Sequence, residues 1–104
     1  DEITGIEIPE VPAAFALYQN YPNPFNPVTT IRFDLPESSN VRIVIYNVKG
    51  QKVRILMDKR ISAGRKSVDW NGRNEKGVKA ASGVYFYHIS AGRFRETRKM
   101  ILMR

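Results

Sequence analysis

The stretch GVYFYHISAGRFRETRKMILM, residues 83–103, carries the clearest structural pattern in this 104-residue chain. Its first half alternates, so that Tyr85 and Tyr87 share one side of an extended backbone and the residues between them share the other. The triplet SAG at 90–92 is a typical turn signal, and the run at 94–103 indicates a final strand. The stretch therefore predicts two β-strands joined by a turn.

Similar short runs, separated by turn residues, occur along the chain from Phe15 onward. Together with the two runs above, they predict strands at about 15–18, 30–35, 41–46, 53–56, 67–70, 84–89 and 94–103. Helix should be scarce, because no stretch of useful length repeats its apolar residues with the helical period. We therefore expect an all-β fold, an antiparallel β-sandwich of about seven strands.

The first 14 residues differ from the rest in composition. They include Pro9 and Pro12 and lack helical periodicity, so we expect an acidic linker or leader at 1–14, or an added edge segment. The folded domain should then span residues 15–104. Because the chain starts at Asp1 rather than Met, we also expect it to be a piece of a longer protein.

Three prolines, Pro22, Pro24 and Pro27, lie within six residues just before the strand expected at 30–35. Proline fixes φ at about −65°, has no N–H to donate, and pushes the residue before it toward extended geometry. We therefore expect a stiff, extended crossing that wraps one end of the sandwich. It should insert Phe25 into the core and offer a neighbouring chain no regular ladder to pair with.

The net charge of +7 is unevenly distributed. Residues 1–31 contain four acidic and no basic residues, whereas all 17 basic residues lie from Arg32 onward, against six acidic residues. A basic globule suggests an anionic partner, although charged strand edges that prevent aggregation would give the same pattern. Cysteine is absent, so no disulfide or thiolate contributes. The apolar run at 100–103 is too short to cross a bilayer, so we expect no transmembrane segment.

No pattern in the chain indicates a catalytic centre. The only histidine, His88, lies in the middle of an expected strand, and the acidic residues are scattered. The loop DWNGRNEKG at 69–77 fits a calcium loop at its first and third positions, but Arg73 occupies the fifth and Gly72 comes two residues early. We therefore expect no enzyme activity, no cofactor and no metal, and a loop capped by its own side chains.

Aromatic residues among basic ones are also typical of nucleic-acid and carbohydrate binding. Trp70, Tyr85 and Tyr87 are, however, the large side chains that a sandwich core of this size requires. We expect them in the core, and we expect no nucleic acid among the partners.

Four segments in order make a more specific pattern: LYQNYPNPFNPVTTIRFDLP at 17–36, VRIVIYNVKGQKVRIL at 41–56, SAGRKSVDWNGRNEKG at 62–77 and ASGVYFYHISAGRFRETRKMIL at 81–102. They resemble the successive motifs of the C-terminal sorting domain of the type IX secretion system. The variant that fits best, type A, also resembles the immunoglobulin-like domain of the flagellar hook-capping protein. The resemblance implies an immunoglobulin-like sandwich at the C-terminus of an exported protein of the Bacteroidetes-like lineages.

In this family the domain is an address for secretion. The resemblance implies that the domain is covalently linked to an N-terminal cargo, folds in the periplasm in transit, and is recognised by the type IX translocon of the outer membrane. As a further step it implies a sortase-like surface protease, which cuts before the domain and attaches the cargo to the cell surface. The implied final location is extracellular or at the cell surface.

The resemblance carries over to particular residues. The family motif positions are Pro22, Asn23, Pro24, Phe25, Asn26, Pro27, Gly50, Gln51, Trp70, Gly72, Gly83 and Tyr85. The candidates for translocon recognition are Arg98, Lys99, Met100, Ile101, Leu102 and Arg104, in or after a final strand whose backbone edge we expect to be open to strand addition. The motif glycines and tyrosine also have a purely structural interpretation, as turn and core residues.

A function of another class stays open, namely an immunoglobulin-like spacer or a surface or polysaccharide attachment module of a secreted enzyme. Position separates the two, because a sorting domain must be the last domain of its parent whereas a spacer can be internal. The chain ends five residues after Lys99, as the domains of the family do, and this favours sorting.

Overall fold

The computed structural model describes residues 11–104, and every regular element in that range is a β-strand. The strands are β1 (Ala16–Leu17), β2 (Thr29–Leu35), β3 (Ser39–Asn47), β4 (Lys52–Ile61), β5 (Gly64–Trp70), β6 (Gly83–Ala91) and β7 (Phe94–Leu102). Of the leader predicted at 1–14, residues 1–10 lie outside the described residues. The prediction of an all-β fold with about seven strands is confirmed.

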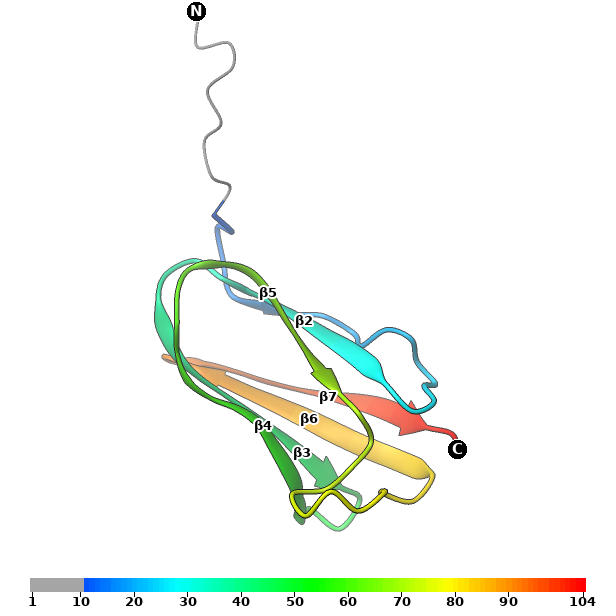
Figure 1. The fold of residues 1–104 in the computed structure, drawn as a ribbon. Helices are drawn as coiled ribbons and strands as arrows, with labels where there is room; N and C mark the ends of the chain where they lie inside the picture. The colour runs from blue at the N-terminus through cyan, green and yellow to red at the C-terminus, as the bar shows by residue number, and fades with distance from the viewer. Residues whose placement is uncertain (1–10) are drawn as a thin grey trace, which may run out of the picture.

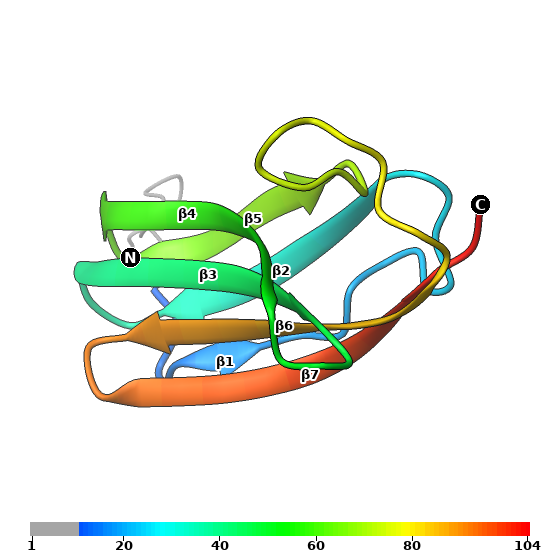
Figure 2. The same ribbon diagram turned by 90° about the horizontal axis from the view of Figure 1, so that it is seen from below.

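The strands form two antiparallel sheets (Figure 1). Sheet A has the order β1-β2-β5, and sheet B has the order β4-β3-β6-β7. Seen from below, sheet B lies in front of sheet A, so that the two layers cover one another (Figure 2). The predicted sandwich is confirmed, and β7 is an outermost strand of the larger sheet.

The core lies between the two sheets and accounts for the alternation seen in the sequence. In β6, Tyr85, Tyr87 and Ile89 are buried, while the residues between them are only half-buried. Trp70, at the end of β5, is fully buried, and its ring centroid lies 5.6 Å from that of Phe25 and 5.3 Å from that of Tyr85. Burying a large apolar side chain contributes roughly 2 kcal/mol relative to leaving it exposed. The expectation that these aromatic residues form the core is confirmed.

The strand predicted at 53–56 is longer than expected, because β4 extends from Lys52 to Ile61. Residues 58–60 in its second half are charged and exposed, since β4 is an edge strand of sheet B. Consecutive charges hide the alternation that marks a half-buried strand, and they also discourage pairing with another chain. The pairing of β4 with β3 contains two register shifts, which further blur its pattern.

The turn between β3 and β4 depends on Gly50, whose φ of +79° is unfavourable for other residues. Asn47 holds this turn, because its side-chain oxygen accepts hydrogen bonds from the N–H groups of Lys49 and Gln51 at 2.9 and 3.0 Å. Asn47 also donates from Nδ2 to Gln51 Oε1 at 2.9 Å. The interpretation of Gly50 as a turn residue is confirmed.

Candidate functional site

The proline-rich segment and the final strand are far apart in sequence but lie side by side. The backbone of Phe25 donates to Ile101 O at 3.0 Å and accepts from the N–H of Met103 at 2.9 Å. The side-chain oxygen of Asn23 accepts from the N–H of Ile101 at 2.9 Å. Phe25 is itself buried in the core, as predicted. We call residues 21–27 the proline clip, because they fasten the end of β7.

The proline clip is not the extended crossing that its prolines predict. Its residues follow a succession of bends, and the peptide bonds before Pro22, Pro24 and Pro27 are cis. The clip pairs with β7 of sheet B at Phe25 and has entered β2 of sheet A by Thr29. Tyr21 and Thr30 pair antiparallel, so the chain reverses its direction between them and has to bend.

The proline clip determines which part of the β7 edge is free. Just before the clipped residues, the carbonyl of Lys99 accepts a hydrogen bond from Gln19 Nε2 at 2.8 Å. The edge is thus covered from Lys99 to Met103, and the prediction that the whole edge is open is wrong for this half. The backbone N–H and C=O groups of Arg95 and Thr97 point to the same edge, and no strand pairs with them among residues 11–104.

Arg104 makes the last of these connections. Its backbone N–H donates to Ser82 Oγ at 2.9 Å, its Nε donates to Ala80 O at 2.7 Å, and its Nη2 donates to Gly72 O. Gly72 has a φ of +72°, and a Cβ built there would lie 2.9 Å from Arg104 Nη2. The side chain of Arg104 therefore ties the loop between β5 and β6 to the end of β7, while the positive φ and the nearby carbonyl of Pro27, 3.1 Å from the added Cβ, favour glycine at position 72.

The candidate recognition residues within β7 fall into two groups. Met100 and Leu102 are fully buried in the core. Lys99 is exposed and Ile101 is half-buried, and both belong to the face of sheet B that points away from the core. In the folded domain, Lys99 and Ile101 are therefore the members of this set whose side chains a partner can contact without unfolding the strand.

Arg98 connects the two sheets. Its Nε donates to Leu17 O in β1 at 2.8 Å and lies 3.1 Å from Glu96 Oε2. A partly exposed ion pair of this kind contributes little, so the bond to the carbonyl is the more important contact. Close by, the rings of Phe15 and Phe94 stack with their centroids 5.4 Å apart. These contacts hold the start of β7 against the N-terminal strand.

Residues 19–103, which include the proline clip and the whole of β7, match the family described as the secretion system C-terminal sorting domain. The chain belongs to this family. The match confirms the type IX sorting domain that the motifs indicate, and it places the fastened edge of β7 within the region that defines the family.

Two solved structures from Porphyromonas gingivalis contain a domain similar to this sorting domain. For dimeric latent PorU the TM-score is 0.69 and the identity 21%, over 88% of this chain and 10% of that chain. For PorZ, described as an essential bacterial surface component of the type IX secretion system, the TM-score is 0.55 and the identity 23%, over 86% of this chain and 11% of that chain. The sorting domain thus spans about a tenth of each protein, and at these identities the likeness shows the fold.

The same sandwich also occurs outside secretion. An alkylpurine DNA glycosylase, AlkC of Pseudomonas fluorescens, solved with DNA containing an abasic site analog, has a TM-score of 0.53 at 16% identity, over 86% of this chain and 30% of that chain. This likeness likewise concerns the fold and not DNA binding. No curated protein sequence matches the sorting domain.

Other motif residues of the sorting domain make structural contacts. The Tyr85 hydroxyl donates to Ala81 O at 2.6 Å, and burial raises the pKa of Tyr85. Trp70 Nε1 donates to Arg73 O at 2.9 Å. Gly83, at the start of β6, has a φ of +151°, which few other residues adopt. These contacts support the structural interpretation of the motif glycines and tyrosine.

Two buried polar groups of the sorting domain were not singled out from its sequence. The Tyr87 hydroxyl donates to Tyr18 O at 2.7 Å and accepts from the N–H of Asn20 at 2.8 Å, and burial raises the pKa of Tyr87 to about 12. Asn20 Nδ2 in turn donates to Thr29 Oγ1 at 2.9 Å and to Pro22 O at 3.2 Å. A core tyrosine implies some hydrogen-bond partner, but partners so distant in sequence leave no local pattern.

The loop that follows β5 is capped by its own side chains, as predicted. Asn71 Oδ1 accepts from the N–H of Arg73 at 3.1 Å, and Asn74 Oδ1 accepts from the N–H groups of Lys76 and Val78 at 2.9 and 3.0 Å. Within residues 11–104, no three His, Cys, Asp or Glu side chains gather closely enough to hold a metal ion. The loop therefore has its own structural explanation.

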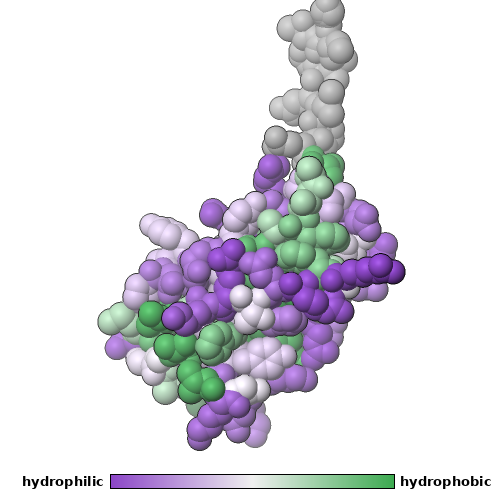
Figure 3. All heavy atoms as spheres, turned by 180° about the vertical axis from the view of Figure 1, so that it is seen from behind, coloured by the Kyte–Doolittle hydropathy of each residue, from purple (hydrophilic) through white to green (hydrophobic). Residues whose placement is uncertain are grey.

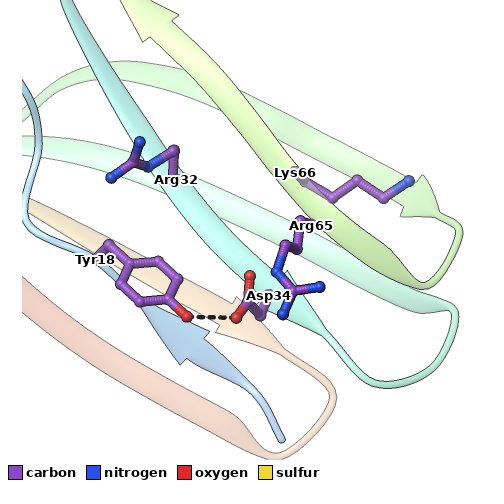
Figure 4. Close-up of a pocket in the computed structure, with 5 residues that line it drawn as sticks. All are labelled: Tyr18, Arg32, Asp34, Arg65 and Lys66. Carbon is purple, nitrogen blue, oxygen red and sulfur yellow. Dashed lines mark hydrogen bonds between the residues drawn. The ribbon is translucent and has the colours of Figure 1, made fainter. Parts of the chain in front are cut away.

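A shallow hollow of about 270 Å³ lies on the outer face of sheet A (Figure 4). The Tyr18 hydroxyl donates to Asp34 Oδ2, and this bond, followed by desolvation, raises the pKa of Tyr18. Figure 4 shows the Arg65 guanidinium close to Asp34, while Lys66 points away from both. The hollow thus contains a carboxylate whose neighbours already satisfy it, and the sequence had not indicated it.

The surface seen from behind is mixed (Figure 3). Hydrophobic areas lie near the start of the described chain and at the opposite end of the molecule, with hydrophilic side chains between them. In the described part of the chain, no helix is long and apolar enough to cross a membrane.

Proposed function

We propose that this chain is a non-catalytic C-terminal sorting module, which directs a covalently linked N-terminal cargo through the outer membrane by the type IX secretion system. Membership of the sorting-domain family supports this function, because such tails are in general non-catalytic and imply export to the cell surface or beyond. Cleavage before the domain by a sortase-like protease, with attachment of the cargo to the surface, is the step that we propose to follow.

One structural observation carries the proposal. The last residues of the chain form a strand fastened on one side to β6 and on the other side to the proline clip, with Arg104 tied to a loop. A free peptide signal would need no such support. The arrangement favours recognition of the tail as a folded surface, after the domain has folded in the periplasm.

The experiment that tests this function appends residues 1–104 to a periplasmic reporter in a host that has the type IX system. We expect the reporter in the medium or on the cell surface. In the same host without a working translocon it should stay in the periplasm, as should the reporter without the domain. If the fusion stays in the periplasm of the competent host although it is folded, the sorting function is refuted, and the spacer function becomes the better account.

A further inference from the structure

The outer face of sheet B carries a row of side chains that crosses all four strands. The register pairs Lys52 of β4 with Tyr46 of β3, Tyr46 with Phe86 of β6, and Phe86 with Lys99 of β7. The neighbours of these residues along each strand, such as Tyr85 and Tyr87, face the core, so the row itself faces solvent. Two aromatic rings thus lie between two lysines, one of which is the recognition candidate Lys99.

Most residues around this row are apolar; the exceptions are His88 and Thr97, which pair beside Phe86 and Lys99 and hydrogen-bond to each other at 2.7 Å. Val84 pairs with Ile101 on one side of it, and Val44 pairs with Ile55 on the other. Val84 and Ile101 are half-buried, Ile55 is 36% exposed, and Val44 is only 2% exposed although it belongs to the outer face. We call this patch the outer apolar face; its members are Val44, Tyr46, Ile55, Val84, Phe86 and Ile101, with Lys52 and Lys99 at its two ends. A continuous apolar surface bordered by charges is typical of a protein-binding site.

The charge at the two ends of the row is positive, and the carboxylate of Glu75 lies beside the outer apolar face at Ile55, whose N–H donates to Glu75 Oε2. Three strand spacings separate β4 from β7, so the two lysine backbones lie about 14 Å apart. Among residues 11–104, no hydrogen bond or ion pair engages the side chain of Lys52 or of Lys99. Arg42, in the next row but one, has Asp58 as its cross-strand neighbour, so its charge is partly offset. The row therefore favours a partner that carries carboxylates at two separated positions.

A partner that recognises Lys99 is less able to bind at the edge of β7 than on the outer face of sheet B. Gln19 bonds to the carbonyl of Lys99, and Asn23 and Phe25 bond to the next outward-facing residue, so a partner strand has no free ladder there. The side chain of Lys99 belongs to the outer face of sheet B, where Phe86 is its cross-strand partner. A partner that contacts Lys99 in the folded domain therefore approaches the face of sheet B, not its edge.

We propose that the outer apolar face docks a protein surface which places an apolar side chain over Phe86 and Tyr46 and carboxylates against Lys52 and Lys99. This inference rests on the proposed function, with a component of the export machinery as the partner. Two half-buried rings are too few for a stacking platform along a nucleic-acid strand, whereas the aliphatic residues on both sides suit apolar protein side chains. The sequence alone points to Lys99, but it does not reveal that Lys52, on an edge strand at the other side of the sheet, belongs to the same surface.

The test uses the reporter fusion with Lys99→Glu, Lys52→Glu and, as the matched control, Arg32→Glu, which reverses an exposed charge on the outer side of sheet A. Reversing one charge in a complementary interface should lower the exported fraction about tenfold or more for either lysine variant, and less than twofold for Arg32→Glu. Equal thermal unfolding midpoints for the three purified variants would show that the loss is not one of folding. Phe86→Thr, which keeps a good strand residue, should reduce export in the same way.

The outcomes separate the two proposals. If the unaltered fusion is exported and Lys52→Glu is exported equally well, the docking face is wrong while the sorting function stands. If the unaltered fusion is not exported, both are overturned. Binding of a single-stranded oligonucleotide by the purified chain, abolished by Phe86→Thr, would also overturn the docking of a protein at this face.

Discussion

Where two segments of the backbone come close together, a single residue can affect stability more than its side chain suggests. Gly72 is the clearest example. We expect Gly72→Ala to lower the free energy of unfolding by about 2–4 kcal/mol, because alanine is unfavourable at a positive φ and the new Cβ would lie 3.1 Å from Pro27 O and displace Arg104 Nη2, 2.9 Å away, from its bond to Gly72 O. Gly77→Ala is the control, since Gly77 has a similar φ of +78° and nothing within 4 Å. Urea denaturation of both variants isolates the steric part; equal losses would show that the contact with Arg104 is unimportant.

Tyr87 is the residue whose ionisation should limit stability at high pH. Burial raises its pKa in the folded domain to about 12, whereas an unfolded tyrosine has a pKa of about 10. Its contribution is therefore complete below pH 10 and is lost as the pH rises from about 10 to about 12, since the unfolded state gives up the proton first. Urea denaturation across this range checks the decline. In Tyr87→Phe the decline should be weaker, although stability at neutral pH falls by about 1–3 kcal/mol, because Tyr18 O and the N–H of Asn20 lose their buried partner.

At the scale of elements, the sequence predicts the position of a strand well when one face of that strand is buried and the other is exposed. β6 and β7 alternate between core and surface, so residues 84–89 and 94–103 are predicted with small errors at their ends. β4 lies at an edge with both faces wet in its second half, so its length is underestimated. The alternation also carries information on the candidate site, because it separates buried Met100 and Leu102 from outward-facing Lys99 and Ile101.

Contacts between distant elements leave no such trace. The prolines of the clip predict a stiff segment. They do not predict that this segment pairs with a strand 78 residues further along the chain. Nor does any local pattern show that Arg104 reaches back to Gly72. The covered half of the β7 edge follows only from these pairings, and this is why the sequence predicts an open edge that the structure does not have.

The proline clip as an element should behave as a removable cover of β7. We expect Phe25→Ala to lower the free energy of unfolding by about 3–5 kcal/mol, because it empties a fully buried position beside Trp70. Amide exchange in the variant should also become faster at Ile101 and Met103, whose N–H groups bond to the clip. The amide of Thr97, which has no such partner strand, is the internal reference. Unchanged protection at Met103 would contradict the pairing of the clip with β7.

For the whole molecule, the end of the chain is both part of the core and the proposed signal, and this affects how truncations are interpreted. Residues 99–104 include buried Met100 and Leu102 as well as exposed Lys99. Deleting them removes recognition and folding together. A loss of export in such a truncation would therefore say nothing about which surface is recognised, whereas single reversals of exposed charges would.

Two truncations of different length should therefore affect folding differently. A chain that lacks residues 103–104 loses the contacts of Arg104 with the loop and the bond from the N–H of Met103 to Phe25 O but keeps the core, so we expect a cooperative thermal transition with stability lower by about 1–3 kcal/mol. A chain that lacks residues 99–104 loses two buried side chains and the strand that pairs with the start of β6, so we expect no cooperative transition. Calorimetry of the two purified chains gives the comparison. If the shorter chain still melts cooperatively within a few degrees of the longer one, the end of β7 is not part of the core that holds the sandwich together. The tail would then have to be recognised as a peptide and not as a folded surface.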